Sequence, residues 1–265
     1  MEQTMSETVL PRPDVALPIT NGPFDRPDAE LVEALRGVST ATASAILHKL
    51  GVRQTFIQGP TTRQPGAKVV GPTTTLQFMP QREDIASGLG QEYIEKTSAL
   101  WHVFDSVQAG DILTIQANAD PYSGCLGEML ISYFKGRGGV GIVVDGYIRD
   151  WPNVQKIGMP LWCRGFTPNY ASQAGQYPWA YNVPIDCARV LVIPGDIVIA
   201  DDDGAVLVPR AMASMVANGT RKIEDWEIFS RMRMAEGGSI WKYYPLSEEG
   251  EEEYIRWRDD NAEHS

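Results

Sequence analysis

A short run of residues without any polar side chain, 139–144, limits what this chain can fold into more than any other feature. Its sequence is GVGIVV. A strand with one face in water alternates apolar and polar side chains, whereas a continuously apolar run is expected of a strand covered on both faces. The run therefore predicts a central strand that lies between two packed layers.

Helical and strand-like patterns alternate on both sides of this run. Strand-like segments, marked by β-branched and apolar residues, lie at 66–78, 109–117 and 159–165, with a hairpin at 194–209. Helix-like segments, marked by apolar spacing or capping residues, lie at 41–50, 91–104, 127–135, 152–158 and 210–234. This alternation predicts an α/β domain with a mixed sheet.

The two ends of the chain differ from its centre. Five prolines within residues 1–27 favour an extended arm over a core element. Acidic residues gather near the C-terminus, where they are typical of a solvated segment, and the preceding WKYYPL (241–246) can pack on a neighbour. We expect three parts: an N-terminal extended arm over 1–37, the α/β domain over 38–235 and an acidic extension over 236–265.

Composition restricts the partners and the compartment. A net charge of −11 without a basic stripe argues against nucleic acid, because phosphate binding needs clustered Lys and Arg. The N-terminus lacks the pattern of a signal peptide, and no apolar run approaches the roughly 18 residues of a membrane helix. Three widely spaced cysteines do not form a disulfide framework. We expect a cytoplasmic protein with no nucleic-acid and no membrane partner.

Three charged residues flank the apolar run and form the candidate site. Glu128 follows Gly127 on a turn before the run, and the pair Arg149–Asp150 comes just after it. A guanidinium beside a carboxylate at a strand end can present an anion-binding fork and a hard cation at one point. This arrangement suggests a metal-assisted reaction on a small carboxylate substrate. The alternatives are structural, since Asp150 can cap the next helix, Arg149 can form a surface ion pair, and Glu128 suits a first helical turn.

Other motifs favour ordinary structural roles. The glycines of GRGGVG (136–141) have dinucleotide-loop spacing but follow a helix and lead into a strand, the wrong context for a cofactor loop. The acidic run DDDG (201–204) lies between two apolar runs and predicts a hairpin turn rather than a metal site. The three histidines have no metal-ligand spacing, and neither they nor the cysteines support nucleophilic catalysis.

The Gly-acid-x-Leu turn at 127–130, the twenty residues that follow Glu128, and Arg149–Asp150 after GIVVDG resemble the class II pyruvate aldolases. That family includes 4-hydroxy-4-methyl-2-oxoglutarate / 4-carboxy-4-hydroxy-2-oxoadipate aldolase, and it shares the fold of the regulator of ribonuclease activity A. Segments such as STATASAILHKLG, GAKVVGPTTT and KIGMPLWCRG support the resemblance, which covers roughly residues 38–235. It implies a layered β/β/α domain with a mixed sheet.

The resemblance also implies roles for the site residues. Asp150 would bind Mg²⁺ (or Mn²⁺) directly, and Glu128 would hold a metal-bound water. Main-chain amides around Gly127, Met129 and Leu130 would bind the substrate carboxylate, while Arg149 would contact the reacting oxygen.

The implied activity is a metal-dependent retro-aldol cleavage of a 4-hydroxy-2-oxo acid to pyruvate, with oxaloacetate decarboxylation as a side activity. The family also implies a homotrimer or homohexamer in which a carboxylate of a neighbouring subunit's C-terminal helix, Glu224 or Glu227, completes the site. Two rival functions remain: a non-catalytic regulator that binds a protein, and a lyase or decarboxylase for a different oxo acid.

Three features depart from the family pattern. Glu128 stands where the aldolases have Asp, and Asn153 stands where a further acid is common. The segment 165–183 predicts an unusually long loop with four aromatic residues, Tyr170, Tyr177, Trp179 and Tyr181. These rings either determine substrate choice or pack on the core or an interface.

Overall fold

A computed structural model describes residues 15–86, 91–171 and 175–262 of the chain. It divides into two compact units, Met1–Ala213 and Ser214–Ser265. This division falls inside the region 38–235 that the sequence suggested as one domain. None of the helices in the described part of the chain is both long and apolar enough to cross a lipid bilayer.

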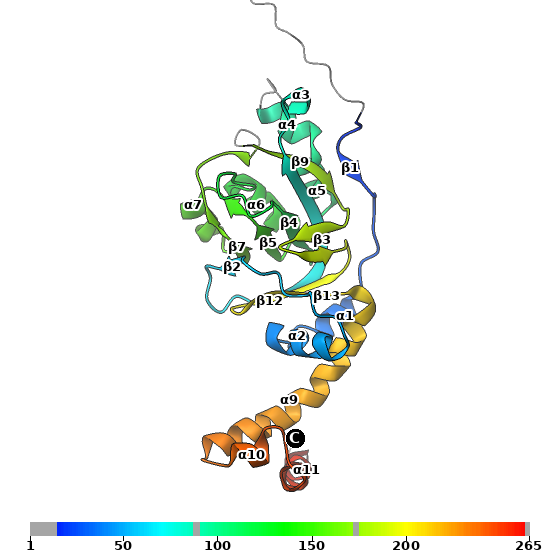
Figure 1. Ribbon diagram of the computed structural model, residues 1–265, viewed down its shortest axis with the longest axis vertical. Helices are drawn as coiled ribbons and strands as arrows, with labels where there is room; N and C mark the ends of the chain where they lie inside the picture. Colours follow the sequence, from blue (N-terminus) through cyan, green and yellow to red (C-terminus); the bar gives the residue numbers. More distant parts are fainter. Residues whose placement is uncertain (1–14, 87–90, 172–174, 263–265) are drawn as a thin grey trace, which may run out of the picture. The chain divides into compact units, whose positions relative to one another are not determined.

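The first unit is built around a mixed sheet of nine strands within the described residues (Figure 1). The main path runs β1 (Ile19–Thr20), β9 (Gln176–Tyr181), β3 (Val69–Pro80), β4 (Ile112–Gln116), β5 (Gly141–Asp145), β7 (Leu161–Cys163) and β2 (Thr61–Thr62). Strands β3, β4, β5 and β7 are parallel, whereas β9 pairs antiparallel to β3. A hairpin of β12 (Ile197–Asp201) and β13 (Gly204–Val208) joins the other half of β3.

Shorter elements complete this unit. Two small sheets pair β6 (Tyr147–Ile148) with β8 (Gly165–Phe166), and β10 (Ile185–Cys187) with β11 (Val190–Val192). The helices are α1 (Ala29–Ala34), α2 (Thr40–Lys49), α3 (Glu83–Ala86), α4 (Gln91–Thr97), α5 (Ala99–Ser106), α6 (Glu128–Gly136), α7 (Trp151–Ile157) and the 3-10 turn η1 (Arg210–Met212).

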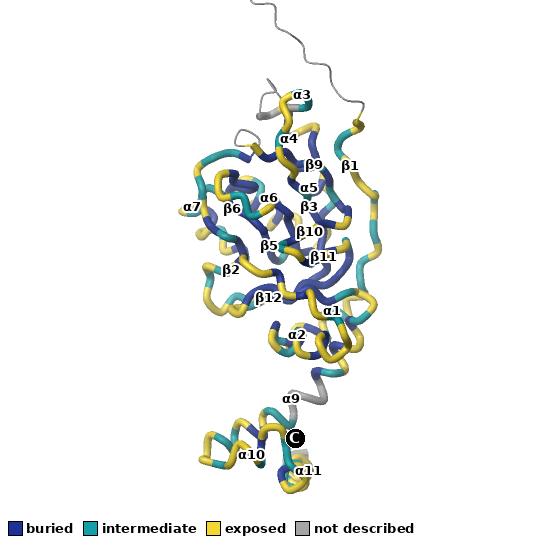
Figure 2. The backbone as a smooth tube through the Cα atoms, in the orientation of Figure 1, coloured by how far each residue is buried: buried dark blue, intermediate teal, exposed yellow. Residues whose placement is uncertain are grey.

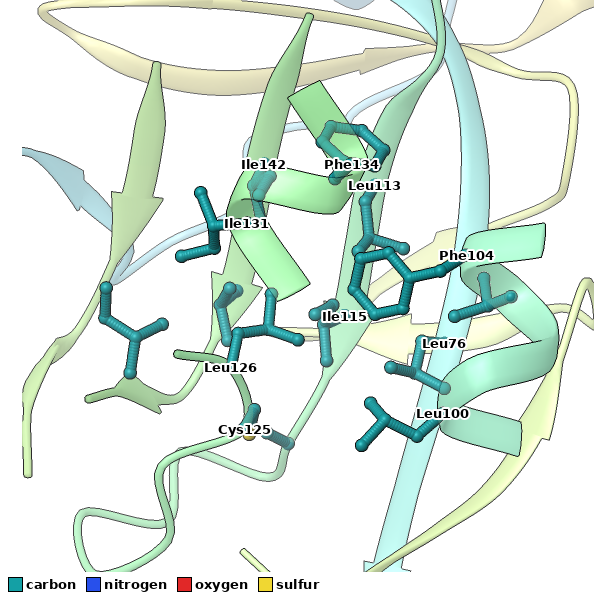
Figure 3. Packing of buried hydrophobic residues seen from close by; sticks show 14 of the residues in the cluster. Leu76, Leu100, Phe104, Leu113, Ile115, Cys125, Leu126, Ile131, Phe134 and Ile142 are labelled. Atoms are coloured by element: carbon teal, nitrogen blue, oxygen red, sulfur yellow. The ribbon is translucent and has the colours of Figure 1, made fainter. Parts of the chain in front are cut away.

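The apolar strand β5 is covered on both faces, as its sequence predicts. Ile142 and Val144 face a core that includes residues of helices α5 and α6 (Figure 3). Val143, between them, belongs to a second core with Trp162 and residues of β10, β11, β12 and β13. Buried backbone accordingly gathers in the central strands (Figure 2). The layered α/β architecture with a mixed sheet is therefore confirmed.

Most predicted elements are present, with small shifts of their ends. The helix predicted at 91–104 is two helices, because Ser98 begins α5 by accepting a hydrogen bond from the amide of Leu100. The glycine-rich segment 136–141 ends α6 and enters β5, so the turn interpretation is confirmed. The acidic run at 201–204 is a hairpin turn, also as predicted.

The prediction of a long loop over 165–183 is wrong. Residues Gln176–Tyr181 form strand β9 within the large sheet, paired with both β3 and β1. The pairing register shifts between Gln77 and Phe78, so Pro178 faces Phe78 while Ala180 faces Gln77. A bulge accommodates Pro178, which lacks the amide of a regular ladder residue. The proline and glycine residues of this segment favoured the prediction of a loop, although residues 176–181 form a strand.

The N-terminal arm is also not extended throughout. Residues 15–28 contain no helix, and β1 within them pairs with β9. Helix α1 then follows, although the whole region 1–37 was expected to be extended. Arg26 donates to both carboxylate oxygens of the fully buried Asp111, at 2.7 Å each. This buried, bidentate ion pair fastens the arm to the unit.

The second unit consists of helices. These are α9 (Ala213–Ala235), α10 (Ile240–Tyr243) and α11 (Glu248–Ala262). Phe229 is fully buried, and its ring lies within 6 Å of Tyr243, Tyr254 and Trp257. Most of the acidic residues of α11 are exposed, but Glu253 pairs with Lys242 at 3.0 Å. The acidic extension is thus a helix held by an aromatic core, not simply a solvated segment.

Candidate functional site

Asp150 adopts a backbone conformation that is unusual for a residue with a side chain. Its φ is 62° and its ψ is 29°, in the left-handed region. Although it precedes α7, its carboxylate makes no capping hydrogen bond to that helix. The capping alternative therefore does not explain Asp150. Left-handed residues other than glycine are uncommon and cluster at functional sites.

The carboxylate of Asp150 turns instead toward the start of α6. Its Oδ2 lies 3.4 Å from the amide nitrogen of Glu128. A Cβ placed on Gly127 would come within 2.4 Å of the same oxygen, closer than real contacts allow. Gly127 has φ −134°, which any residue can adopt. Glycine is needed here for space rather than for backbone freedom.

Arg149 is held beside this contact by main chain and by an aromatic ring. Its amide donates to the carbonyl of Leu126 at 2.9 Å, and its Nε lies 3.9 Å from Asp150 Oδ2. The Tyr170 ring centroid is 3.7 Å from the guanidinium carbon, a close cation–π contact. The guanidinium therefore has a defined plane next to the Asp150 carboxylate.

A set of main-chain hydrogen bonds brings these distant segments together. Gly124 donates to the carbonyl of Asn169, and Cys125 donates to the carbonyl of Tyr147. Segment 124–126 thus runs between β6 and the residues before Tyr170, which carries the three parts of the site into contact. A Cβ on Gly124 would lie 2.7 Å from the Asn169 oxygen, so this close approach also requires glycine.

The start of α6 provides amide donors. The amides of Met129 and Leu130 belong to its first turn, where a helix has no internal acceptor for them. Together with the helix dipole they form a region that favours an anion. Met129 is 76% exposed, and the contribution expected of it is its main-chain amide.

A small pocket adjoins Arg149 and the start of α6. Its volume is about 30 Å³, enough for one or two water-sized groups. The side chains that line it are mostly apolar and come from β3, α4, α5 and α6, with Tyr170, Ala171 and Pro178 on the remaining side. Glu128 and Asp150 are half-buried and do not line this pocket.

The donors present are compatible with Mg²⁺. Carboxylate oxygens are its preferred protein ligands, and the ion commonly retains several waters beside one or two carboxylates. The Asp150 side chain is 35% exposed and is not used for capping. Among the described residues no cluster of three or more His, Cys, Asp or Glu could enclose a metal. An ion here would have Asp150 as its candidate direct ligand and Glu128 as a further candidate, with water completing its shell.

The structure brings the main-chain amide of Glu128 and the side chain of Arg149 to the Asp150 carboxylate. A role for the three residues as one site stays a prediction. The structure adds Tyr170, which the sequence marked only as one of four aromatic residues. Of the two C-terminal candidates, the Glu224 side chain lies outside the described residues, and Glu227 is half-buried on α9 in the second unit.

The cysteines do not offer a nucleophile. Burial raises the pKa of the Cys163 thiol to about 11 and that of Cys125 and Cys187 further. A thiol with such a pKa stays protonated near neutral pH, and only the thiolate is reactive. The carboxylate of Asp201 in the acidic hairpin already has hydrogen-bond partners. It accepts hydrogen bonds from the amide and the hydroxyl of Thr40, at 2.9 and 2.6 Å.

Comparison with known proteins relates this geometry to one family. The chain is 30% identical over 155 residues to a putative 4-hydroxy-4-methyl-2-oxoglutarate aldolase from Halalkalibacterium halodurans, covering 58% of this chain and 66% of that protein. It is 24% identical to Protein DlpA from Legionella pneumophila, of which it spans only 32%. The chain thus spans less than two thirds of the length of each of these relatives.

Among solved structures, Streptomyces coelicolor RraAS2 is 53% identical, with a TM-score of 0.73 over 80% of this chain and 100% of that chain. That protein is described as an unusual member of the RNase ES inhibitor RraA protein family. An uncharacterized protein from Pseudomonas syringae shares the fold, with a TM-score of 0.70 at 23% identity. A family model for RraA-like proteins, described as Aldolase/RraA, matches residues 29–207. The protein is therefore a member of the RraA-like aldolase/RraA family.

Proposed function

We propose that this protein is a divalent-metal-dependent aldolase that cleaves a 4-hydroxy-2-oxo acid to pyruvate. The observation that carries the proposal is the placement of Asp150. Its backbone is left-handed, and its carboxylate makes no capping hydrogen bond. This carboxylate lies beside Arg149 and the first amide of α6. The relatives named as aldolases support the same class of reaction.

The site is suited to bind a 2-oxo acid. The first-turn amides of Met129 and Leu130 would donate hydrogen bonds to its carboxylate, because they have no acceptor in their own helix. Arg149 would donate to the 2-oxo oxygen, with its guanidinium held in orientation by Tyr170. A fixed donor at an oxygen that gains charge is worth about 3–4 kcal/mol of barrier in comparable sites.

In the cleavage the C4 hydroxyl loses its proton as the C3–C4 bond breaks. C4 becomes the carbonyl of an aldehyde or ketone, and the bonding electrons pass to C3 and the 2-oxo oxygen as an enolate. Protonation at C3 then gives pyruvate. Arg149 would stabilise the charge on the oxygen, and Glu128 would accept the hydroxyl proton through water.

A bound Mg²⁺ or Mn²⁺ would supply Lewis-acid stabilisation of the same oxygen. Because decarboxylation of oxaloacetate leaves the same enolate, we expect that reaction as a side activity. We also expect the protein to be a homotrimer or homohexamer, with Glu224 or Glu227 of a neighbouring copy as candidates to complete the site.

The test is pyruvate release from a panel of 4-hydroxy-2-oxo acids, with Mg²⁺ and with EDTA. Activity should require the metal and should be lost in Asp150→Asn, which keeps the shape of the side chain but removes the charge that a metal ligand needs. Asp203→Asn, the same change at an exposed hairpin acid, should retain activity. Near-normal turnover by Asp150→Asn would show that the metal assignment is wrong.

A second candidate is a non-catalytic inhibitor of an RNase E-type ribonuclease. The 53% identity to RraAS2 over that whole chain favours it. If the protein is such a regulator, the wild type and the Asp150→Asn variant should inhibit the ribonuclease equally well. Neither form should then release pyruvate from any member of the panel.

A further inference from the structure

The cleavage described above requires two proton transfers, and only the first has an assigned residue. Glu128 would accept the proton of the C4 hydroxyl, whereas C3 of the enolate must gain a proton before pyruvate is complete. Glu128 does not line the pocket beside Arg149. If Arg149 binds the 2-oxo oxygen, C3 is bonded to the carbon that carries this oxygen. The donor to C3 is therefore expected among the side chains next to Arg149.

Few side chains of this pocket carry a proton that can be transferred. Most of the lining is apolar, and Leu100 and Leu126 belong to the core drawn in Figure 3. Besides Arg149, the proton-bearing side chains among the described lining residues are those of Glu95, Cys125 and Tyr170. Burial raises the pKa of the Cys125 thiol, so this thiol holds its proton tightly. Glu95 already takes part in another interaction.

Tyr170 is fixed beside Arg149 by its ring and its main chain. The ring centroid lies 3.7 Å from the guanidinium carbon. A β-bridge pairs Tyr170 with Gly124, whose amide donates to the carbonyl of Asn169 at 3.0 Å. The residue is half-buried, and its hydroxyl makes no hydrogen bond to any other described residue. The ring contact thus places the residue, and the hydroxyl is available to a bound molecule.

A proton transfer from this hydroxyl would keep the negative charge beside Arg149. As the O–H bond of Tyr170 breaks and the C3–H bond forms, the enolate electrons restore the C2 carbonyl, and the charge passes to the phenolate. This phenolate belongs to the ring that lies on the guanidinium, so the cation keeps a nearby counter-charge. The phenolate then regains a proton from solvent, and Glu128 releases the proton of the C4 hydroxyl, which balances the reaction.

We propose, resting on the aldolase function above, that Tyr170 is the catalytic residue that protonates C3 of the enolate. In the reverse direction its phenolate removes a proton from the methyl group of pyruvate. A positioned acid or base of this kind contributes about 10²–10⁴-fold to the rate. The rival donors are a water molecule and the carboxyl group of Glu95.

The experiment measures exchange of the C3 protons of pyruvate for deuterium, by NMR in D2O with Mg²⁺. Tyr170→Phe keeps the ring on Arg149 and removes only the hydroxyl. Exchange should fall by about 100-fold or more in this variant, because the acid and base at C3 is lost. Pyruvate affinity, measured by calorimetry, should change little. A merely structural role of the ring would leave the exchange rate of Tyr170→Phe close to that of the wild type.

Two control variants separate Tyr170 from its rivals. Tyr122→Phe makes the same change at a tyrosine that is 62% exposed and does not line the pocket, and it should exchange like the wild type. Glu95→Gln should also retain exchange. Exchange that is kept in Tyr170→Phe would overturn the proposal, with water as the donor if Glu95→Gln also exchanges and Glu95 as the donor if it does not. Loss of pyruvate binding in Tyr170→Phe would also overturn the proposal, because the hydroxyl would then be a binding group.

The same measurements distinguish failure of this role from failure of the aldolase function. A wild type that neither exchanges pyruvate protons nor releases pyruvate from the panel would refute both. A wild type that cleaves a member of the panel, with normal exchange in Tyr170→Phe or with no exchange in either form, would refute the role of Tyr170 alone.

Discussion

Gly127 has no side chain to take part in chemistry, yet it determines where the Asp150 carboxylate can lie. A β-carbon at this position would occupy the space of Oδ2, and it would also lie 3.2 Å from Nε of Arg149. Asp150 in turn holds a left-handed conformation that costs of order 1–3 kcal/mol. The geometry of the candidate site therefore depends on the lack of a side chain at Gly127 and on the strained backbone of Asp150, whose carboxylate takes that space.

Gly127→Ala should reduce turnover strongly while the protein remains folded, because the added carbon displaces Asp150 and Arg149. Gly136→Ala is the matched control, since a Cβ there meets nothing within 4 Å at the end of the same helix. That control should keep activity and gain roughly 0.5–1 kcal/mol of stability. Steady-state kinetics and thermal melting of both variants test this. Equal activity in the two would show that the close contact has no functional role.

Arg149→Lys should lower kcat by roughly a hundredfold while the charge is kept, because an ammonium does not provide a planar fork. It also cannot reproduce the stacked contact with Tyr170. The measurement is kcat with a saturating 4-hydroxy-2-oxo acid, together with circular dichroism to confirm the fold. A rate close to wild type would remove Arg149 from the chemistry.

At the scale of elements, strand β9 shows that the aromatic residues of 165–183 have different roles. One contacts a residue of the candidate site, and others pack in the core. Tyr170 lies on Arg149 and lines the pocket. Tyr177 is 6% exposed and packs with Ile94, while Trp179 is partly buried against this pair and against the core that contains Val143. The first residue belongs to the site, and the other two belong to the packing of the sheet.

Trp179→Ala should therefore destabilise the protein without changing substrate preference. We expect a loss of about 2–3 kcal/mol, below the range for a fully buried tryptophan because its side chain is only partly covered. Tyr170→Leu should show the opposite result, with preference or kcat altered and stability nearly kept. Denaturant unfolding and the relative rates across the panel of 4-hydroxy-2-oxo acids distinguish the variants. A shifted preference in Trp179→Ala would place that ring in the site.

In the helical unit, acid should weaken the contact between α10 and α11. A hydrogen bond from Lys242, with one from Tyr243, holds the pKa of Glu253 below its ordinary value of 4.5. A lowered folded-state pKa adds stability above the ordinary pKa, and this stability is lost as the pH falls through the folded pKa. The difference in melting temperature between wild type and Glu253→Gln should be constant near neutral pH and shrink below about pH 4.5. A difference that persists in strong acid would contradict this assignment.

At the scale of the whole molecule, exposed apolar side chains suggest self-association. Trp241 is 90% exposed and its neighbour Ile240 is 58% exposed, both on α10. Light scattering at micromolar concentration should give a mass three or six times that of the 29.3 kDa chain. Trp241→Ser should lower that mass on dilution if this surface takes part. A monomeric wild type would contradict the prediction and leave the site without a neighbour's carboxylate.

Local sequence determined much of the fold. The apolar run of β5 can be stable only under cover on both faces, and an Asp-Gly turn between apolar runs favours a hairpin locally. Both features depend on side chains within a few positions of each other, so periodicity and turn chemistry predicted them. The positions of Glu128 and Arg149–Asp150 predicted their convergence for a different reason. A helix between two parallel strands runs back along the sheet, so the start of α6 and the residues after β5 lie at the same edge.

Other features were decided only by tertiary structure. Strand β9 exists because β3 and β1 offer it partners, and pairing of this kind outweighs the turn tendency of glycine and proline. The αL conformation of Asp150 and the contact of Tyr170 with Arg149 likewise need segments that are far apart in the sequence. The sequence alone thus identified the candidate residues of the site. Packing determined whether the Asp150 carboxylate caps a helix or turns to Gly127, because only packing supplies the energy to hold the less favourable conformation.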